Sequence, residues 1–310
     1  MPFLTNYNII RRRAKDRMNE KKKCPNCGLL IDSDIEKCPY CGVLISECEN
    51  KPNVVESGVI EVKKTKKATF PHGIFTFSRV EEVSSLKRIS LFLSVILGLT
   101  IITSIFYFFS SKFNPYFLTS ITGNAMLNFS AYLIIFGCCL LIINKDYKNV
   151  LSKYGKSRTY LYGIGYGFLL LLISATYSAF VRTIFPGVGE NNNENSINKI
   201  IAAYPIFSLI VFAFIGPMCE EFAYRLGLFG FVRKYKRIAA YIITALIFGF
   251  IHFDFSGDLK VEFLNLPSYV LSGLLLCYVY DKEGIETSTV THITNNLIAI
   301  IFTIYSVFFL

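Results

Sequence analysis

The sequence predicts an all-α polytopic membrane protein with about seven to eight transmembrane helices, preceded by a small cysteine-rich module. Two observations carry this prediction. Of the 310 residues, 53% are hydrophobic and the mean hydropathy is +0.45, although the chain before residue 88 is mostly polar, so the apolar excess lies in the C-terminal two thirds. The second observation is a pair of closely spaced CxxC sequences near the N-terminus.

Seven apolar runs in the C-terminal part are long enough to be read as spanning helices, each of which needs about 20 residues. They lie at Ile89–Ser110, Ala125–Asn144, Thr159–Val181, Ile200–Gly230, Ile238–Phe253, Phe263–Tyr280 and Thr287–Leu310. The fourth run is the longest, and a break within it would raise the number of spans to eight.

The net charge of +10 is concentrated in alternate connections between these runs. The connection 145–158 contains five cations and 233–237 contains four, namely Lys145, Lys148, Lys153, Lys156, Arg158, Arg233, Lys234, Lys236 and Arg237. The opposite connections carry only Lys112 at 112–123 and no cation at 186–198. Since cytoplasmic loops are enriched in Lys and Arg, and no signal peptide is visible, the N-terminal part is expected in the cytoplasm of a multi-pass cell-membrane protein. Membrane lipids are the expected partners of these cations.

Two CxxCG sequences, Cys24–Gly28 and Cys38–Gly42, predict a structural metal site. Four thiolates, from Cys24, Cys27, Cys38 and Cys41, suit tetrahedral Zn²⁺, and metal binding would stabilise a module too small for a sufficient apolar core. This segment resembles the short zinc ribbons of bacterial membrane proteins. A redox dithiol pair or disulfides are the alternatives, and a reducing cytoplasm disfavours the disulfides.

These features divide the chain into four predicted parts: a basic N-terminal segment at 1–21, the zinc ribbon at 22–45, a basic linker at 46–87 and the transmembrane part at 88–310. A cytosolic protein partner is expected for the ribbon. Nucleic acid is disfavoured, because few aromatic residues accompany the cations that flank the ribbon. The polar loop 191–195 is expected to be a solvated connection without a function of its own.

Ionisable residues inside apolar runs are costly and indicate function. Glu220, Glu221 and Arg225 lie in the fourth run, and His252 ends the fifth. At about 1.5 Å per residue, Glu220 and His252 lie roughly 20 Å from the turn that joins their runs, so they are expected at similar depth. The last run adds His292 and Asn296, which share a helical face because they are four residues apart.

The spacing also predicts roles for these six residues. Glu221 and Arg225 are at i and i+4, where an ion pair can neutralise both and support the site. Glu220, rotated about 100° from Glu221, is expected to act as the general base for water together with His252. His292 and Asn296 are expected to donate hydrogen bonds to the oxyanion of a tetrahedral intermediate.

The sequences EExxxR at 220–225, FxxxH at 248–252 and HxxxN at 292–296 resemble the three ordered motifs of the CPBP intramembrane proteases, also called the CAAX-processing and Abi (abortive infection) family. The resemblance covers about residues 205–300. It implies an intramembrane endopeptidase that acts on a membrane-associated or C-terminal peptide. Eukaryotic members remove three residues from prenylated CAAX proteins, whereas bacterial members include bacteriocin-immunity and peptide-processing proteins.

Three alternatives stay open at this stage. Glu220, His252 and His292 would also form a His₂Glu set for catalytic zinc, so a metalloprotease and a metal-independent glutamate protease are both compatible with the sequence. A non-proteolytic bacteriocin-immunity or binding protein could retain the same pocket. A transporter could use the acidic pair, but the chain lacks matching halves with broken helices.

Overall fold

The computed structural model describes residues 21–24, 30–33, 35, 36, 38, 44, 45, 83–152 and 154–310. The chain forms two compact units, Met1–Arg79 and Val80–Leu310. In the first unit, β1 (Lys21–Lys23) pairs antiparallel with β2 (Leu30–Asp32). The predicted ligands Cys27 and Cys41, and nearly all of the predicted N-terminal segment and linker, lie outside the described residues.

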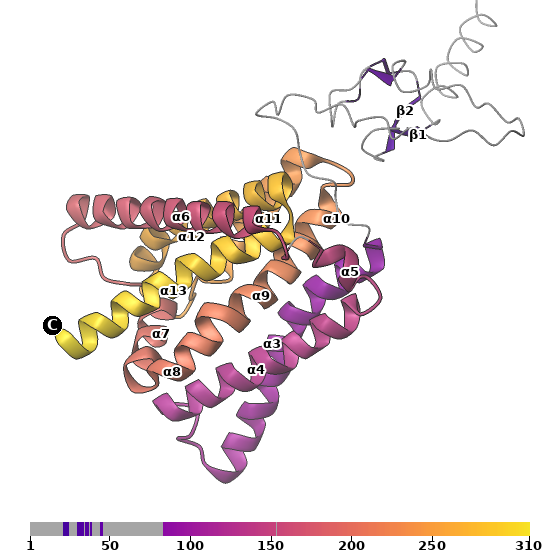
Figure 1. The fold of residues 1–310 in the computed structure, drawn as a ribbon. Helices are drawn as coiled ribbons and strands as arrows, with labels where there is room; N and C mark the ends of the chain where they lie inside the picture. Colours follow the sequence, from indigo (N-terminus) through magenta and orange to yellow (C-terminus); the bar gives the residue numbers. More distant parts are fainter. Residues whose placement is uncertain are drawn as a thin grey trace, which may run out of the picture. The chain divides into compact units, whose positions relative to one another are not determined.

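The second unit is helical throughout its described regular structure (Figure 1). Its elements are α3 (Ser85–Phe113), α4 (Ile121–Ile143), α5 (Tyr147–Val150), α6 (Ser157–Ile184), α7 (Asn192–Ala203), α8 (Pro205–Ser208), the π-helix η1 (Leu209–Ile215), α9 (Gly216–Glu220), the π-helix η2 (Glu221–Phe229), α10 (Gly230–Val232), α11 (Arg237–Phe250), α12 (Leu259–Glu283) and α13 (Ile285–Phe309).

Six helices in the described part of the chain are long and apolar enough to cross a membrane, which confirms the predicted all-α membrane architecture. They are Ser85–Phe113, Ile121–Ile143, Ser157–Ile184, Pro205–Val232, Leu259–Glu283 and Ile285–Phe309. The fifth predicted run forms α11, a helix of 14 residues. At about 21 Å it is shorter than the roughly 30 Å of a bilayer core, because the polar turn that contains His252 and Asp254 follows directly. The eighth span is not formed among these residues: the long fourth run is cut only at Tyr204, where the short helix α7 ends.

The segment Pro205–Val232, which contains α8 to α10, is the central helix of this unit (Figure 1). Of the residues in its most apolar stretch 56% are buried, whereas the share in the other five long helices is 28% or less. It packs against α3, α4 and α13. Two of its stretches are π-helical, a local geometry that is frequent at functional sites.

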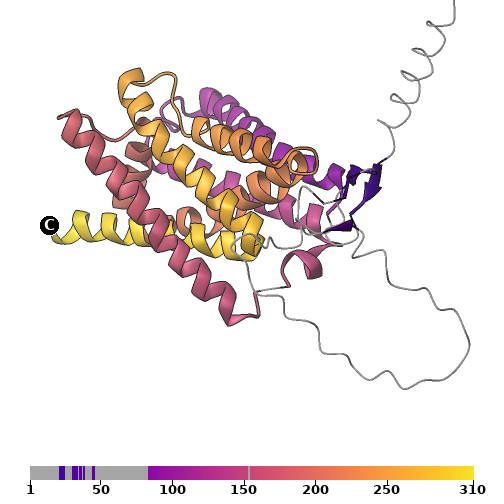
Figure 2. The same ribbon diagram turned by 90° about the horizontal axis from the view of Figure 1, so that it is seen from above.

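Helices α6 and α13 cross each other (Figure 2), and two glycines of α6 lie at the contact. A Cβ atom added at Gly163 would lie 2.5 Å from Val290 Cγ1, and one at Gly167 would lie 2.6 Å from Thr294 Cβ. Close approach at small residues four positions apart is a common way to pack helices in lipid. This contact fixes α13, which carries two predicted site residues.

A buried arginine attaches α3 to the central helix. Arg88 is fully buried, and its guanidinium donates hydrogen bonds to the backbone oxygens of Val83 and Leu226. Leu226 belongs to η2, so a side chain from a neighbouring helix satisfies a π-helical carbonyl. Such pairing is needed because lipid offers backbone groups no partner.

Candidate active site

Three of the six predicted site residues line one cavity of about 370 Å³. Glu220 ends α9, His252 follows α11, and Asn296 lies in α13. The fold therefore brings together side chains from three separate helical segments. Tyr132 of α4 and Tyr269 of α12 are also part of the lining.

The other three predicted residues are not in the lining and form a buried cluster. Glu221 and Arg225 are fully buried, and His292 is 5% exposed. Arg225 Nη1 lies 3.2 Å from Glu221 Oε1, which is the i, i+4 ion pair expected from the spacing. His292 Nδ1 lies 2.9 Å from the same Glu221 oxygen. The Arg225 guanidinium also lies over the Phe248 ring, 4.4 Å from its centroid.

Ser288 is a further member of the buried cluster that the sequence reasoning missed. Its hydroxyl donates to Glu221 Oε2, so both oxygens of this carboxylate have partners. Ser288 lies four residues before His292 on α13 and therefore on the same helical face. That spacing is a signal that could have identified it.

Glu220 is held more loosely than Glu221. Its side chain is 16% exposed. Its Oε1 accepts a hydrogen bond from the Tyr132 hydroxyl at 3.4 Å, and its Oε2 lies 3.8 Å from His292 Nε2. Tyr132 belongs to α4, far from the three motifs in sequence, and no local pattern marked it. Glu220 is therefore the glutamate of the pair that is open to the cavity.

The orientation of His252 follows from its backbone contact. Its Nδ1 lies 2.8 Å from the Phe248 oxygen, and because a carbonyl can only accept, Nδ1 carries the proton. In the neutral ring Nε2 then has a free lone pair. The His252 ring stacks on Tyr269, with 4.5 Å between ring centroids and 13° between the ring planes. A group able to accept a proton is thus held rigidly at the cavity wall.

The loop 191–195 is not the functionless solvated connection that the sequence predicted. Asn191 is 1% exposed and caps α7, accepting from the backbone N–H of Glu194. Its amide donates to the His252 backbone oxygen at 3.2 Å, and the Tyr269 hydroxyl donates to its Oδ1. The reason for the error is that one asparagine here both caps a helix and bridges two other segments, which polarity alone does not reveal.

A second set of contacts fixes the turn after His252. Glu262 accepts hydrogen bonds from the backbone N–H groups of Asn192 and Asp254. Hydrogen bonds from Ser256 and from the Asn192 side chain hold the pKa of the Asp254 carboxyl below its usual range. Asp254 therefore stays anionic and keeps the turn in place.

Asn296 and His292 differ as candidate oxyanion donors. Asn296 Nδ2 donates to the Phe212 oxygen at 3.0 Å, and its Oδ1 accepts from Asn295. One of its two amide hydrogens remains for a ligand in the cavity. His292 donates through Nδ1 to Glu221, since a carboxylate can only accept, so its Nε2 becomes a donor only when the ring is doubly protonated.

The described residues contain no group of three or more His, Cys, Asp or Glu side chains arranged to hold a metal ion. In the N-terminal unit, Cys24 and Cys38 are each 1% exposed and pack with Ile31 and Ile45. Two of the four predicted zinc ligands are therefore buried in one cluster.

Comparisons with known proteins relate this chain to membrane proteases. Residues 202–298 match the family model described as type II CAAX prenyl endopeptidase Rce1-like, and residues 20–45 match a zinc-ribbon domain. The predicted resemblance to the CAAX-processing family, with an N-terminal zinc ribbon, is therefore confirmed.

Relatives from bacteria carry corresponding names. The membrane-embedded CAAX protease MroQ of Staphylococcus aureus is 31% identical over 146 residues, which cover 44% of this chain and 55% of that protein. The putative membrane peptidase YdiL of Bacillus subtilis is 26% identical over 180 residues, covering 57% of this chain and 70% of that protein. An uncharacterized Mycoplasma capricolum protein is 26% identical over 180 residues, covering 54% of this chain and 51% of its own length. The chain thus spans only about half the length of two of these relatives, and no solved structure matches it.

Proposed function

We propose that this protein is an intramembrane endopeptidase that hydrolyses a peptide bond in a membrane-associated or C-terminal peptide. The observation that carries the proposal is the convergence of Glu220, His252 and Asn296 on one cavity within the helical bundle. A base and a hydrogen-bond donor at one wall are what amide hydrolysis requires. The relatives named as membrane peptidases support the same reaction class.

In the proposed reaction Glu220 and His252 orient a water molecule, and one of them accepts its proton as the water oxygen attacks the peptide carbonyl carbon. The free lone pair on His252 Nε2 suits it to this step. The carbonyl oxygen becomes an anion that accepts a hydrogen bond from the remaining N–H of the Asn296 amide. The C–N bond then breaks, and the proton taken from water passes to the leaving amine.

Glu221 and Arg225 support this chemistry without contacting the substrate. Glu221, neutralised by Arg225, orients the His292 ring, and the other nitrogen of that ring faces Glu220 at 3.8 Å. His292 can join Asn296 as an oxyanion donor only in its doubly protonated form. Glu220, His252 and His292, the set that the sequence suggests for a catalytic zinc, are not arranged to hold a metal ion in this structure, so no step of the proposed reaction uses one.

The test is cleavage of candidate membrane peptides by native membranes that contain the wild type, Glu220→Gln or His252→Ala. We expect both variants to lose about 10²- to 10⁴-fold in kcat, the usual contribution of a general base. Glu283→Gln is the matched control, because Glu283 pairs with Arg158 at a helix end and does not line the cavity. Wild-type turnover that both site variants retain would exclude the proposed reaction.

We also propose that the ribbon binds one structural Zn²⁺ through Cys24, Cys27, Cys38 and Cys41. The zinc-ribbon match and the burial of Cys24 and Cys38 support this assignment. The metal content of the purified full chain is expected to be one zinc per chain. Cys24→Ser with Cys38→Ser should abolish it, whereas Cys138→Ser, which changes an exposed cysteine of α4, should not. The expected cytosolic partner of the ribbon stays a prediction.

A further inference from the structure

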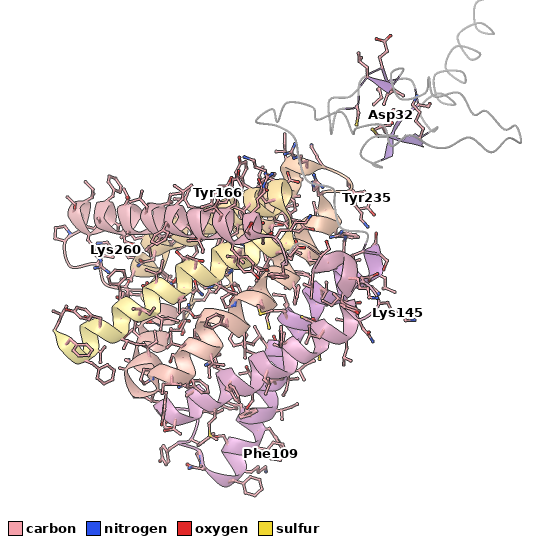
Figure 3. The ribbon with its side chains drawn as sticks, viewed as in Figure 1. Asp32, Phe109, Lys145, Tyr166, Tyr235 and Lys260 are labelled. Carbon is pink, nitrogen blue, oxygen red and sulfur yellow. The ribbon has the colours of Figure 1, made fainter. Side chains whose placement is uncertain are left out.

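The spanning helices of the second unit end alternately at two faces. The connections 144–156 and 233–236 lie at one face, together with the start of α3, where Lys87 pairs with Asp146 at 2.6 Å. The connections 114–120, 185–191 and 251–258 lie at the other. In Figure 3, Lys145 and Tyr235 of the first face are labelled at the right, and Lys260, which follows 251–258, at the left.

The two faces differ sharply in charge. The connection 144–156 contains four cations and 233–236 contains three, whereas the three connections of the other face contain none. We call them the cation-rich and the cation-poor face. Because lysine and arginine accumulate in cytoplasmic loops, the cation-rich face is assigned to the cytoplasm and the cation-poor face to the opposite side.

The active-site cavity reaches toward the cation-poor face. Its lining includes Asn193, Glu194 and Ile197 of α7 and Ile251 and His252 of the connection 251–258. A second cavity of about 240 Å³ shares five lining residues with the first, namely Asn128, Tyr132, Asn193, Ile197 and Phe212. It continues to Thr119, in the connection 114–120, and to Lys199. Neither lining contains a residue from the cation-rich connections.

Buried ion pairs lie at the cation-rich end of the bundle. Asp281, near the end of α12, is 2% exposed. Its carboxylate lies 2.5 Å from Arg233 Nε and 2.8 Å from Arg237 Nη2, and it accepts the Tyr241 hydroxyl. These contacts join the connection 233–236 to α11 and α12.

The second cavity is suited to a peptide more than to an acyl chain. Asn124 and Asn128 donate through Nδ2 to backbone oxygens of their own helix. Each Oδ1 is then an acceptor for which the described residues provide no partner. Ser196 and Thr119 add hydroxyl groups. Such groups can bind the main-chain N–H and C=O of an extended peptide, whereas hydrocarbon would leave them unsatisfied.

From this arrangement we infer that the active site opens on the membrane face away from the cytoplasm and that its substrate is an extended peptide segment exposed on that side. The inference rests on the proposed peptidase function for the substrate. The direction of the opening rests only on the charge distribution and the cavities.

The direction is tested by labelling cysteines introduced one at a time into the full chain with Cys138→Ser, in cells that express it, with the labelling of that parent chain subtracted as background. Ser196→Cys reports the second cavity, and Lys145→Cys is the matched position at the cation-rich face. A membrane-impermeant sulfonated maleimide should label Ser196→Cys in intact cells at least about tenfold faster than Lys145→Cys, with the difference lost after permeabilisation. Equal labelling in intact cells, or faster labelling of Lys145→Cys, would overturn the inference.

The substrate is tested with impermeant quenched fluorescent peptides added to right-side-out and inverted membrane vesicles. Cleavage that depends on Glu220 is expected in the right-side-out vesicles alone. Cleavage in inverted vesicles alone would overturn the inference and leave the proposed peptidase intact. No cleavage in either preparation, with the labelling as expected, would remove the peptidase and the substrate assignment but keep the direction of the opening.

Discussion

Glu220 and Glu221 are consecutive residues with the same side chain, but they have different surroundings. Glu221 is fully buried, and its two oxygens contact Arg225, His292 and Ser288. Glu220 faces the cavity, and its contacts to Tyr132 and His292 are longer, at 3.4 Å and 3.8 Å. Neighbouring residues on a helix point about 100° apart, so one carboxylate can belong to the scaffold and the next to the reaction. One sequence motif can therefore supply both a structural carboxylate and a reacting one.

The largest effect that would separate the two glutamates is on stability. Glu221→Ala leaves the Arg225 guanidinium buried without its anion, and we expect the free energy of unfolding to fall by about 3–5 kcal/mol. Thermal and denaturant unfolding in detergent micelles measure this change. Glu220→Ala is the matched control and should cost less than about 1 kcal/mol, because its side chain reaches the cavity. Equal losses of stability would mean that Glu221 is no more important for the fold than Glu220.

The next effect concerns the two asparagines of α13. Asn296→Ala removes the proposed oxyanion donor, so kcat should fall about 10²- to 10³-fold with KM little changed. Asn295→Ala is the control, because Asn295 contacts Asn296 but does not line the cavity. Peptide turnover in membranes gives both constants. A rise in KM with constant kcat would make Asn296 a binding residue instead.

Ser288→Ala tests the contacts that hold Glu221, and its expected effect on stability is smaller than that of Glu221→Ala. It removes a hydrogen bond to a buried carboxylate, and the expected loss is about 1.5–3 kcal/mol in the free energy of unfolding. Ser174→Ala, which affects a half-buried contact with Ser272 at 3.4 Å, should cost about 1 kcal/mol or less. If Ser288→Ala is as mild as Ser174→Ala, the carboxylate of Glu221 does not depend on this partner.

Tyr132→Phe tests the longer contacts of Glu220 and should have the smallest effect of these changes. The hydroxyl lies at 3.4 Å from Glu220, so its removal is expected to lower kcat by about tenfold, equivalent to about 1.4 kcal/mol. The unfolding midpoint should stay unchanged. Tyr177→Phe is the control, because its hydroxyl donates to the Leu264 oxygen away from the cavity. A loss of stability without a change in kcat would mean that Tyr132 stabilises the fold and does not assist the reaction.

Much of the site could be predicted from the spacing of residues along the chain. Four residues separate Glu221 from Arg225, and the charged atoms do lie 3.2 Å apart, even though this stretch is a π-helix. Contacts between different helices could not be predicted from spacing in this way. Tyr132 and Asn191 reach Glu220 and His252 from elements with no motif of their own, and their roles depend on how the helices pack.

The sequence by itself determined the class of protein: apolar runs long enough for lipid, charged residues where lipid makes them costly, and two CxxC pairs. These are local properties of composition and spacing. Only the tertiary structure decided that Glu220, His252 and Asn296 share a cavity while Glu221, Arg225 and His292 are buried behind it. It also decided that α11 is short and that the cavity reaches one face. The physical reason is that exposure depends on the neighbours a helix acquires in packing, and those neighbours come from distant parts of the chain.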